Sequence, residues 1–256
     1  MRSLIRWPGG KGRATKIILP YLQEKEEIFS PFFGGGIIEL NLASTGKRVY
    51  GYDNFEQLVN FWNYAINDTN KLYKKTIIHF NFFHSSDKTK DEKKKYYLKL
   101  KKFCLKEKNT IKGAAAFFVV NRVSYSGLTL LGGFSEMAID MEFGIGILER
   151  LKNFKIDNLS VELLDFKESF NRHPNIMAYI DPPYYLTKGW LYGEDGSSHK
   201  NFDHEGLSNI LHNRDKWILS YNNCDKVKEL YNEYRIIEPI WSYGMSWGYK
   251  DEEKSK

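Results

Sequence analysis

The sequence has few cysteines and no long apolar run, and each shortage excludes a class of protein. Cys104 and Cys224 are the only cysteines among 256 residues, too few for a disulfide framework or a cysteine zinc site. The longest apolar run, residues 114–120, is far below the roughly 18 residues of a membrane span. The chain also does not begin with the apolar core of a signal peptide. We therefore expect a cytoplasmic protein that does not enter a membrane.

The histidines do not have the spacing of metal ligands. They form no HxxxH pair and no Cys/His pattern, because they stand at positions 79, 84, 173, 199, 204 and 212. We therefore expect no metal site.

What the sequence does have is a basic segment. The chain carries 38 Lys+Arg against 32 Asp+Glu, a formal charge of +6, and residues 68–108 alone contain 13 lysines, no arginine and 5 acidic residues. A basic segment on a near-neutral body indicates a polyanionic partner such as nucleic acid. The lysines also alternate with Tyr96, Leu100 and Phe103. The alternative is therefore an amphipathic helix with a solvated face.

The hydrophobic pattern alternates between strands and helices. Expected strands are 27–30, 48–52, 159–164, 176–180 and 217–221, and expected helices are 15–22, 36–44, 57–66, 203–213 and 225–234. This alternation predicts a doubly wound, mostly parallel α/β sheet. Residues 69–150 interrupt it with helical and then glycine-rich sequence. We expect an α/β domain of residues 1–68 and 151–256 with residues 69–150 as an inserted helical module.

Three glycines stand between an expected strand and an expected helix in SPFFGGGIIEL. Bare backbone at Gly34–Gly36 would let a ligand approach the carboxyl edge of the sheet, and Asp53, at the end of the next strand, can accept hydrogen bonds from ribose hydroxyls. The segment is not a dinucleotide fingerprint, because Glu39 stands where a glycine is needed, and WPGGKGRAT is not a P-loop. A tight turn without a ligand is the alternative.

The motif Asp181-Pro182-Pro183-Tyr184 follows an apolar strand. Two prolines remove two amide donors, which leaves carbonyl oxygens beside a carboxylate and an aromatic ring. Such a site suits a planar group that donates hydrogens, such as the amino group of a base. Asp181 and the Pro182 carbonyl would accept its two hydrogens, and Tyr184 would stack on the ring. Alone, the motif could also be a simple Pro-Pro turn.

Four motifs follow one another along the chain: WPGGK, SPFFGGG, the strand VYGYD and DPPY. This order resembles the pattern of the Dam-like DNA adenine-N6 methyltransferases, the D12 class. The resemblance covers essentially the whole chain, and NRVSYSGL (121–128) is similar to the NRxxxNGL stretch of the family's target-recognition module. It implies the class I S-adenosylmethionine-dependent methyltransferase fold, with the inserted helical module as the target-recognition domain. It also implies methylation of adenine N6 at a specific sequence in double-stranded DNA, with base flipping and S-adenosyl-L-methionine as donor.

The same resemblance implies roles for single residues. The residues expected to bind the donor are Trp7, Lys11, Phe32, Gly34, Gly36, Asp53, Asp165, Phe166 and Asp181. Those expected to form the catalytic pocket are Asp181, Pro182, Pro183 and Tyr184. Those expected at the DNA are Arg6, Arg122, Tyr125 and Ser126, with Arg122 supporting the loop.

The chain departs from the family pattern in three places. Ser30 stands where the family usually has Asp or Glu before the proline of the glycine loop, so a contact to the donor's ammonium group is absent or moved. Leu130 and Ser126 stand where GATC-reading members have Arg and Asn, which argues against a GATC site; Leu130→Arg is expected to shift the preference toward guanine. The family usually continues with another strand after an SK-like turn, whereas this sequence stops at DEEKSK. We therefore expect either that the last strand is truncated or that the sheet keeps an open edge.

Other activities stay open from the sequence alone. RNA adenine or a protein glutamine could be the methyl acceptor, because a planar amide fits the same pocket. A non-catalytic DNA-binding relative could keep the fold, although intact DPPY and WPGGK argue against it. We expect a monomer or weak dimer that acts on double-stranded DNA in a bacterial, phage or viral host cell.

Overall fold

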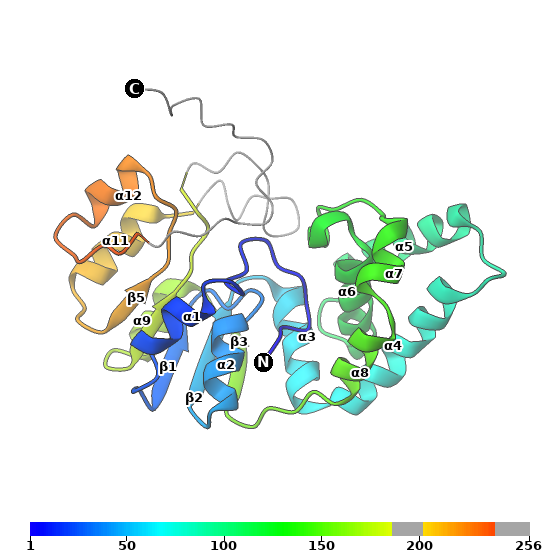
Figure 1. Cartoon of the computed structure of the whole chain (residues 1–256), viewed down its shortest axis with the longest axis horizontal. Coiled ribbons are helices and arrows are strands. Elements are labelled where there is room, and N and C mark those ends of the chain that lie inside the picture. The colour runs from blue at the N-terminus through cyan, green and yellow to red at the C-terminus, as the bar shows by residue number, and fades with distance from the viewer. Residues whose placement is uncertain (186–201, 239–256) are drawn as a thin grey trace.

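The computed structural model describes residues 1–185 and 202–238, and at its centre is a sheet of five parallel strands (Figure 1). The strands are β1 (Glu27–Ser30), β2 (Arg48–Asp53), β3 (Leu159–Leu163), β4 (Met177–Ile180) and β5 (Trp217–Leu219). Their order in space is β3-β2-β1-β4-β5. Every described pair of neighbouring strands is parallel, and the α/β fold expected from the sequence is confirmed.

Both faces of the sheet are buried. Successive side chains of a strand point to opposite faces, so Ile28 belongs to one buried cluster and Phe29 to the other, and each cluster includes side chains of helices. Helices on both faces make the sheet doubly wound. These helices are α1 (Thr15–Ile18), α2 (Ile37–Ser44), α3 (Glu56–Asn67), α9 (Phe166–Arg172), α11 (His204–His212) and α12 (Asp225–Leu230).

The order of strands reverses between β1 and β4. β2 and β3 follow on one side of β1, while β4 and β5 lie on the other. In sheets of this kind, ligands bind outside the carboxyl ends of the strands at such a reversal. β1 ends at Ser30, just before the glycine loop, and β4 ends at Ile180, just before Asp181. The two motifs therefore meet at the same edge.

Helices α4 to α8 gather beside the sheet (Figure 1). α6 is the centre of this group, because residues 113–123 are all buried and the helix packs against α3, α4, α5 and α7. The group comprises α4 (Thr69–His84), α5 (Lys90–Lys106), α6 (Ile111–Val123), the 3₁₀ turn η2 (Tyr125–Gly127), α7 (Glu136–Glu142) and α8 (Ile145–Lys152). The longest apolar run of the sequence is thus the core of this module. The domain boundaries near 69 and 150 stay predictions.

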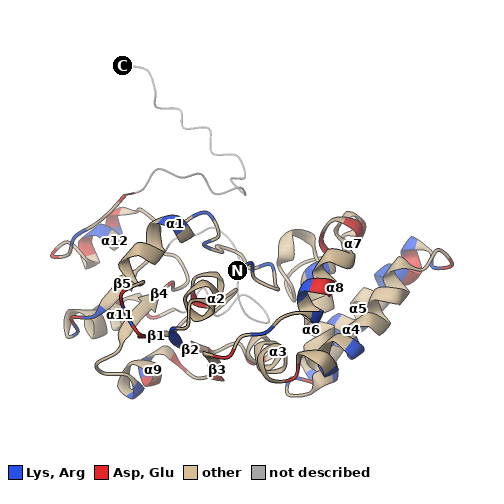
Figure 2. Ribbon diagram, turned by 60° about the horizontal axis from the view of Figure 1, so that its bottom comes forward, with Lys and Arg blue, Asp and Glu red and all other residues tan. Residues whose placement is uncertain are grey.

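The basic segment forms α4 and α5 at the outer edge of the module (Figure 2). α5 begins with a capping box between Thr89 and Glu92 and buries Tyr97 and Leu100 on its inner side. The amphipathic pattern is therefore real. The lysines of α5 that remain exposed are Lys90, Lys94, Lys95, Lys99, Lys102 and Lys106.

Some elements differ from those expected. The helix expected over 15–22 changes to a 3₁₀ turn (Leu19–Tyr21), because Pro20 lacks the amide hydrogen that an α-helix needs. α9 lies where the sequence pattern predicts no helix. No described helix combines the length and the apolar character that a bilayer span requires. The residues to which the expectation about the last strand applies, 239–256, lie outside the described part of the chain.

Candidate active site

A cleft with a volume of about 330 Å³ lies at the carboxyl edge of the sheet, which is in the size range of small-molecule sites. It is bordered by the N-terminal segment, the glycine loop and the ends of β2, β3 and β4. All nine residues expected to bind the donor line it: Trp7, Lys11, Phe32, Gly34, Gly36, Asp53, Asp165, Phe166 and Asp181. The structure brings them to one place, and the role of each stays a prediction.

The glycine loop is shaped by close contact with an indole ring. Gly34 and Gly36 have φ angles of 48° and 65°, in the left-handed region that favours glycine. A Cβ atom on Gly34 would lie 2.6 Å from Trp7 Nε1. On the other side, Trp62 of α3 donates from Nε1 to the Gly34 carbonyl at 3.1 Å. The loop is therefore held between two indoles.

Asp53 joins the glycine loop to β2. Its Oδ2 accepts from the Gly34 amide at 2.9 Å, and its Oδ1 accepts from the Phe55 amide at 3.0 Å. Burial raises the pKa of Asp53 to about 6, and these backbone donors offset part of the rise. The Asn54 amide also acts on this carboxylate. A carboxylate has about four lone-pair sites, so Asp53 keeps acceptor capacity for a donor in the cleft.

Lys11, Asp181 and Tyr184 lie together where β4 ends. Lys11 Nζ donates to the two oxygens of Asp181 at 2.5 and 2.6 Å and to the Gly9 carbonyl at 2.8 Å. Burial raises the pKa of Asp181, and the Lys11 ammonium counteracts this rise. Lys11 also lies 4.8 Å from the centre of the Tyr184 ring, which stacks on Tyr221. All three ammonium hydrogens of Lys11 are thus used.

The four residues assigned to the catalytic pocket share one turn after β4 but not one surface. Asp181 and Pro183 line the cleft, whereas Pro182 and Tyr184 lie outside its lining. Neither proline has an amide hydrogen. The wall beside Asp181 therefore offers acceptors rather than backbone donors.

Three phenylalanines group at the end of the cleft next to β3. The ring centres of Phe32, Phe166 and Phe202 lie 5.4 to 5.6 Å from one another, a surface on which a planar base can pack. Asp165 caps α9, because its Oδ1 accepts from the Lys167 amide at 2.9 Å. Phe202 is not among the predicted residues; the only signal was its position in NFDHEGL, just before a helix cap.

Glu39, in the first turn of α2, is a second cleft residue that the motifs do not predict. It lines the cleft and is 2% exposed. Burial raises its pKa to about 7, while the nearby Ser30 hydroxyl and the Lys11 ammonium offset part of the rise. The signal in the sequence is an acid within the apolar segment IIELNLA, since a charge on an apolar helix face needs a partner or a cavity.

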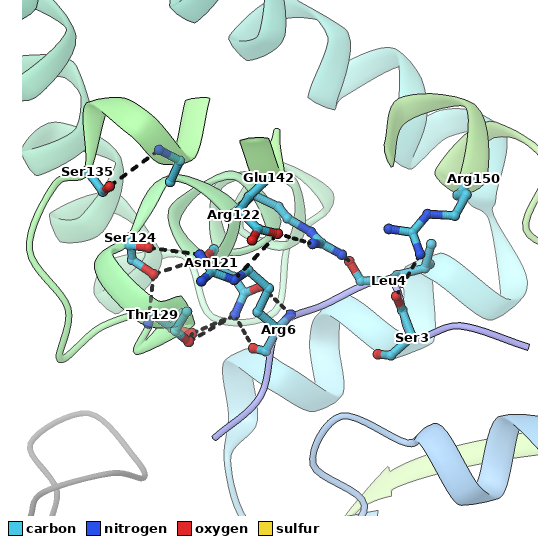
Figure 3. Close-up of polar contacts among 12 residues, drawn as sticks. Ser3, Leu4, Arg6, Asn121, Arg122, Ser124, Thr129, Ser135, Glu142 and Arg150 are labelled. Atoms are coloured by element: carbon cyan, nitrogen blue, oxygen red, sulfur yellow. Dashed lines mark hydrogen bonds and ion pairs between the residues drawn. The ribbon is translucent and has the colours of Figure 1, made fainter. Parts of the chain in front are cut away.

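Hydrogen bonds hold the N-terminal segment against α6 of the helical module (Figure 3). Asn121 of α6 accepts from the Arg6 amide at 2.8 Å and donates to the Arg6 carbonyl at 2.7 Å. Arg122 donates from Nε to the Leu4 carbonyl at 3.0 Å. The same segment continues to Trp7 and Lys11 in the cleft. One short segment thus connects α6 with the cleft.

Arg122 and Arg6 are engaged within the protein. Arg122 is 4% exposed, and burial, reinforced by Arg150, lowers its pKa to about 9. Glu142 lies 3.6 Å from both Arg122 and Arg6, and Arg6 also donates to the Ser124 carbonyl at 3.2 Å. The Arg122 guanidinium is buried against the N-terminal segment, a position from which it can support the loop that follows α6, and its role at the DNA stays a prediction. The contact assigned to Arg6 stays a prediction.

The loop after α6 presents an exposed aromatic ring. Tyr125 is 52% exposed, and Ser126 and Thr129 have left-handed φ angles of 52° and 50°. Asn121 donates to Thr129 Oγ1 at 2.8 Å, and the Thr129 amide donates to Ser124 Oγ at 3.1 Å. Polar contacts from α6 therefore fix the loop that carries Tyr125.

Leu130 lies inside the helical module. It is 4% exposed and belongs to the hydrophobic core. An arginine there would bury its charge among apolar side chains unless the surroundings rearranged. The shift toward guanine expected for Leu130→Arg stays a prediction.

One comparison with known proteins identifies a family. A family model described as D12 class N6 adenine-specific DNA methyltransferase matches residues 7–245, a range that includes the cleft and the loop after α6. No curated protein matches the sequence. In the two described ranges, no group of three or more His, Cys, Asp or Glu side chains is placed to hold a metal ion.

Proposed function

The chain belongs to the D12 class of N6 adenine-specific DNA methyltransferases, and from this premise we propose that it takes the methyl group from S-adenosylmethionine and flips the target adenine out of a specific duplex sequence. Membership makes the protein an enzyme that methylates adenine N6 in DNA. The observation that carries the finer proposal is the convergence of Asp53, the glycine loop and Asp181 on one cleft.

The cleft fits a donor of this shape. Asp53 can accept from ribose hydroxyls, and the phenylalanines Phe32, Phe166 and Phe202 offer apolar surface to the adenine ring. The bare backbone at Gly34 allows close approach of the methionine part. When bound, the donor supplies an electrophilic methyl group on a sulfonium.

Asp181 acts on the target amine. Its carboxylate accepts one N6 hydrogen and the Pro182 carbonyl accepts the other, which turns the nitrogen lone pair toward the methyl group. Positive charge then develops on N6, and the nearby carboxylate stabilises it. Lys11 favours the ionised form of Asp181 before DNA arrives. The proton leaves N6 after transfer, so no general base is needed at the start.

Two tyrosines act on the flipped base and on the space that it leaves. The amino group of adenine is buried in its base pair, so the base must leave the stack, at a cost of a few kcal/mol. Tyr184 stacks on the adenine, and Tyr125, which is 52% exposed, enters the duplex beside it. Exposed lysines of α5 contact phosphates without reading the sequence.

The central test measures transfer of a labelled methyl group from S-adenosylmethionine to duplex DNA, RNA and protein in parallel. We expect label only in DNA, on adenine N6. Asp181→Ala should lower the rate by about a thousandfold or more, because the acceptor that orients the amine is lost. Asp157→Ala removes a carboxylate that is 77% exposed and outside the cleft lining, and should leave the rate unchanged. Unchanged turnover by Asp181→Ala, or label in RNA or protein instead of DNA, contradicts the proposal.

A second test separates contacts to the bases from contacts to the phosphates. Tyr125→Ala should reduce methylation of a randomised duplex library by about tenfold or more, since base stacking contributes roughly 1 to 3 kcal/mol. The slope of log affinity against log salt should not change, because no phosphate contact is lost. Tyr21→Ala is the matched control, because this tyrosine is 46% exposed and lies on the 3₁₀ turn Leu19–Tyr21. If Tyr125→Ala leaves rate and site choice intact, the recognition surface lies elsewhere.

The cytoplasmic location and the monomeric or weakly dimeric state expected from the sequence stay predictions. Light scattering of the purified protein checks the second.

A further inference from the structure

We infer that Glu39 binds the α-ammonium group of the methyl donor. This inference rests on the proposed function, because it takes S-adenosylmethionine as the ligand of the cleft. Glu39 is 2% exposed, stands on α2 and lines the cleft. A buried carboxylate is costly unless a cation or hydrogen bonds compensate it, and the protein itself supplies little compensation.

No described basic side chain forms an ion pair with Glu39. Lys11 acts on it from a distance, but all three of its ammonium hydrogens go to Asp181 and Gly9. The Ser30 hydroxyl lies beside the Glu39 carboxylate and lowers its pKa. However, Ser30 Oγ makes no hydrogen bond of good geometry to any described residue. The backbone amide of Glu39 is the remaining partner, as expected for an acid in the first helical turn.

The charges around the cleft favour a cationic ligand. Among the described residues, five carboxylates and two lysines line it, and each lysine is paired with one carboxylate. Of the three remaining acids, Asp53 accepts from two backbone amides and Asp165 caps α9. Glu39 is the third, and it is the most deeply buried of these three. A positive group bound beside Glu39 would therefore gain a poorly screened attraction.

The order of strands places Glu39 at the correct part of the donor. Asp53 ends β2, Asp181 follows β4, and β1 lies between these strands. Ser30 ends β1, and Glu39 approaches it from α2. With the ribose at Asp53 and the sulfur near Asp181, the donor would cross the central strand, and a tail that turned from the sulfur toward the end of β1 would stay within the same cleft. The ammonium group of that tail then meets Glu39.

The departure at Ser30 is consistent with this assignment. A serine is small, so its side chain leaves space at the end of β1 for a carboxylate that comes from another element. The donor contact expected to be absent or moved in this chain is then moved from the end of β1 to the first turn of α2.

The test compares two ligands that differ only in the ammonium group. Titration calorimetry measures the affinity of S-adenosylhomocysteine, and of its analogue with hydrogen in place of the α-amino group, for wild type and Glu39→Gln. Neither ligand carries the sulfonium, so their affinity ratio isolates the ammonium. Wild type should bind the complete ligand at least about tenfold more tightly than the analogue, as expected for a charge-assisted hydrogen bond. Glu39→Gln should bind both ligands within about twofold of each other.

The possible outcomes separate this inference from the proposed function. Equal affinity of wild type for the two ligands overturns the role of Glu39 and leaves the donor assignment intact. If Glu39 only caps α2, Glu39→Gln lowers the melting temperature but keeps the tenfold discrimination, which also overturns the inference. Wild type that binds neither ligand contradicts the proposed donor, and the inference falls with it. The wild-type comparison needs no variant, so it decides the matter even where Glu39→Gln does not fold.

Discussion

Two loops of this methyltransferase use left-handed backbone, and they hold it by different means. In the glycine loop, Gly34 and Gly36 have φ angles of 48° and 65°, and the Trp7 indole packs against the bare Cα of Gly34. In the loop after α6, Ser126 and Thr129 have φ angles of 52° and 50°. Left-handed backbone is easy for glycine, whereas it costs other residues roughly 1 to 2 kcal/mol.

The difference shows what each loop must preserve. The glycine loop has no side chains between its backbone and its neighbours, so an indole and a ligand can approach closely. The loop after α6 has one such position, Gly127, whose φ angle is 70° and whose Cα packs against Arg6. It keeps side chains at its other two left-handed residues, and Asn121 and Ser124 fix the backbone through Thr129. A larger side chain at Gly34 should therefore distort the first loop, and loss of the polar side chain of Thr129 should destabilise the second.

The largest expected effect is that of Gly34→Ala on donor binding. Its Cβ would lie 2.6 Å from Trp7 Nε1 in a left-handed conformation, so we expect a loss of about 2 to 4 kcal/mol in affinity for S-adenosylhomocysteine. Gly12→Ala is the matched control, because a Cβ there meets nothing within 4 Å. If calorimetry finds similar affinity for both variants, the glycine loop tolerates a side chain at Gly34.

Next in size is the effect of Arg122→Met on stability. The substitution removes the donor to the Leu4 carbonyl from a buried site, and we expect the free energy of unfolding in urea to fall by about 1.5 to 3 kcal/mol. Arg172→Met removes an exposed ion pair with Glu162 and should cost no more than about 0.5 kcal/mol. An equal loss of unfolding free energy in the two variants would mean that the buried contacts of Arg122 stabilise the protein no more than a surface ion pair does.

Donor affinity should fall as the pH falls through about 6. Burial raises the pKa of Asp53 to about 6, and only the carboxylate can accept from both ribose hydroxyls, so affinity should fall by up to about tenfold per pH unit below that value. Folding stability moves the opposite way, because folded Asp53 holds a proton between pH 3.8 and about 6 that the unfolded chain has released. Its contribution to stability therefore rises as the pH falls through this window.

Calorimetry from about pH 7 to pH 5 checks the affinity change, with Asp53→Asn as the control. The variant should lose the step near pH 6. Any step from Glu39, whose pKa is about 7, should remain in both proteins. A wild-type affinity that does not change over this range would remove Asp53 from the ribose site.

The smallest expected effect compares the two left-handed residues of the second loop that carry side chains. Ser126→Gly should stabilise the protein by about 0.5 to 1 kcal/mol, because glycine adopts this conformation without strain. Thr129→Gly gains the same relief but loses the hydrogen bond from Asn121, so it should be neutral or destabilising. Thermal unfolding of both variants decides. Equal stabilisation would show that the side chain of Thr129 does not hold the loop.

The main residues of the site could be predicted because contiguous motifs carry them. DPPY and the glycine loop each follow a strand, and parallel strands of one sheet place their carboxyl ends at the same edge. Asp53 and Asp181, which are far apart in the sequence, therefore had to meet once the strands were recognised. The hydrophobic pattern is less informative at Pro20, because the change from α-helix to 3₁₀ turn depends on a single missing amide hydrogen.

The remaining features depend on packing that local sequence does not encode. Glu39 matters because α2 turns one acid toward the cleft, and Phe202 because the chain before α11 passes beside Phe32. In NRVSYSGL the local pattern alone does not indicate that Arg122 points inward while Tyr125 points outward, although the family resemblance implies a supporting role for Arg122. That choice depends on the N-terminal segment, which lies against the loop only in the folded protein.

The N-terminal segment also imposes an order on synthesis. Its partners are made late: Asn121 stands 115 residues after Arg6, and Asp181 stands 170 residues after Lys11. Chains grow from the N-terminus, and contacts distant in sequence form slowly. This segment therefore leaves the ribosome before its partners do, and it is among the last parts to reach its final position. A nascent chain that ends before β4 has a Lys11 without its carboxylate, so the cleft and its connection to the loop after α6 are completed only after β4 has been translated.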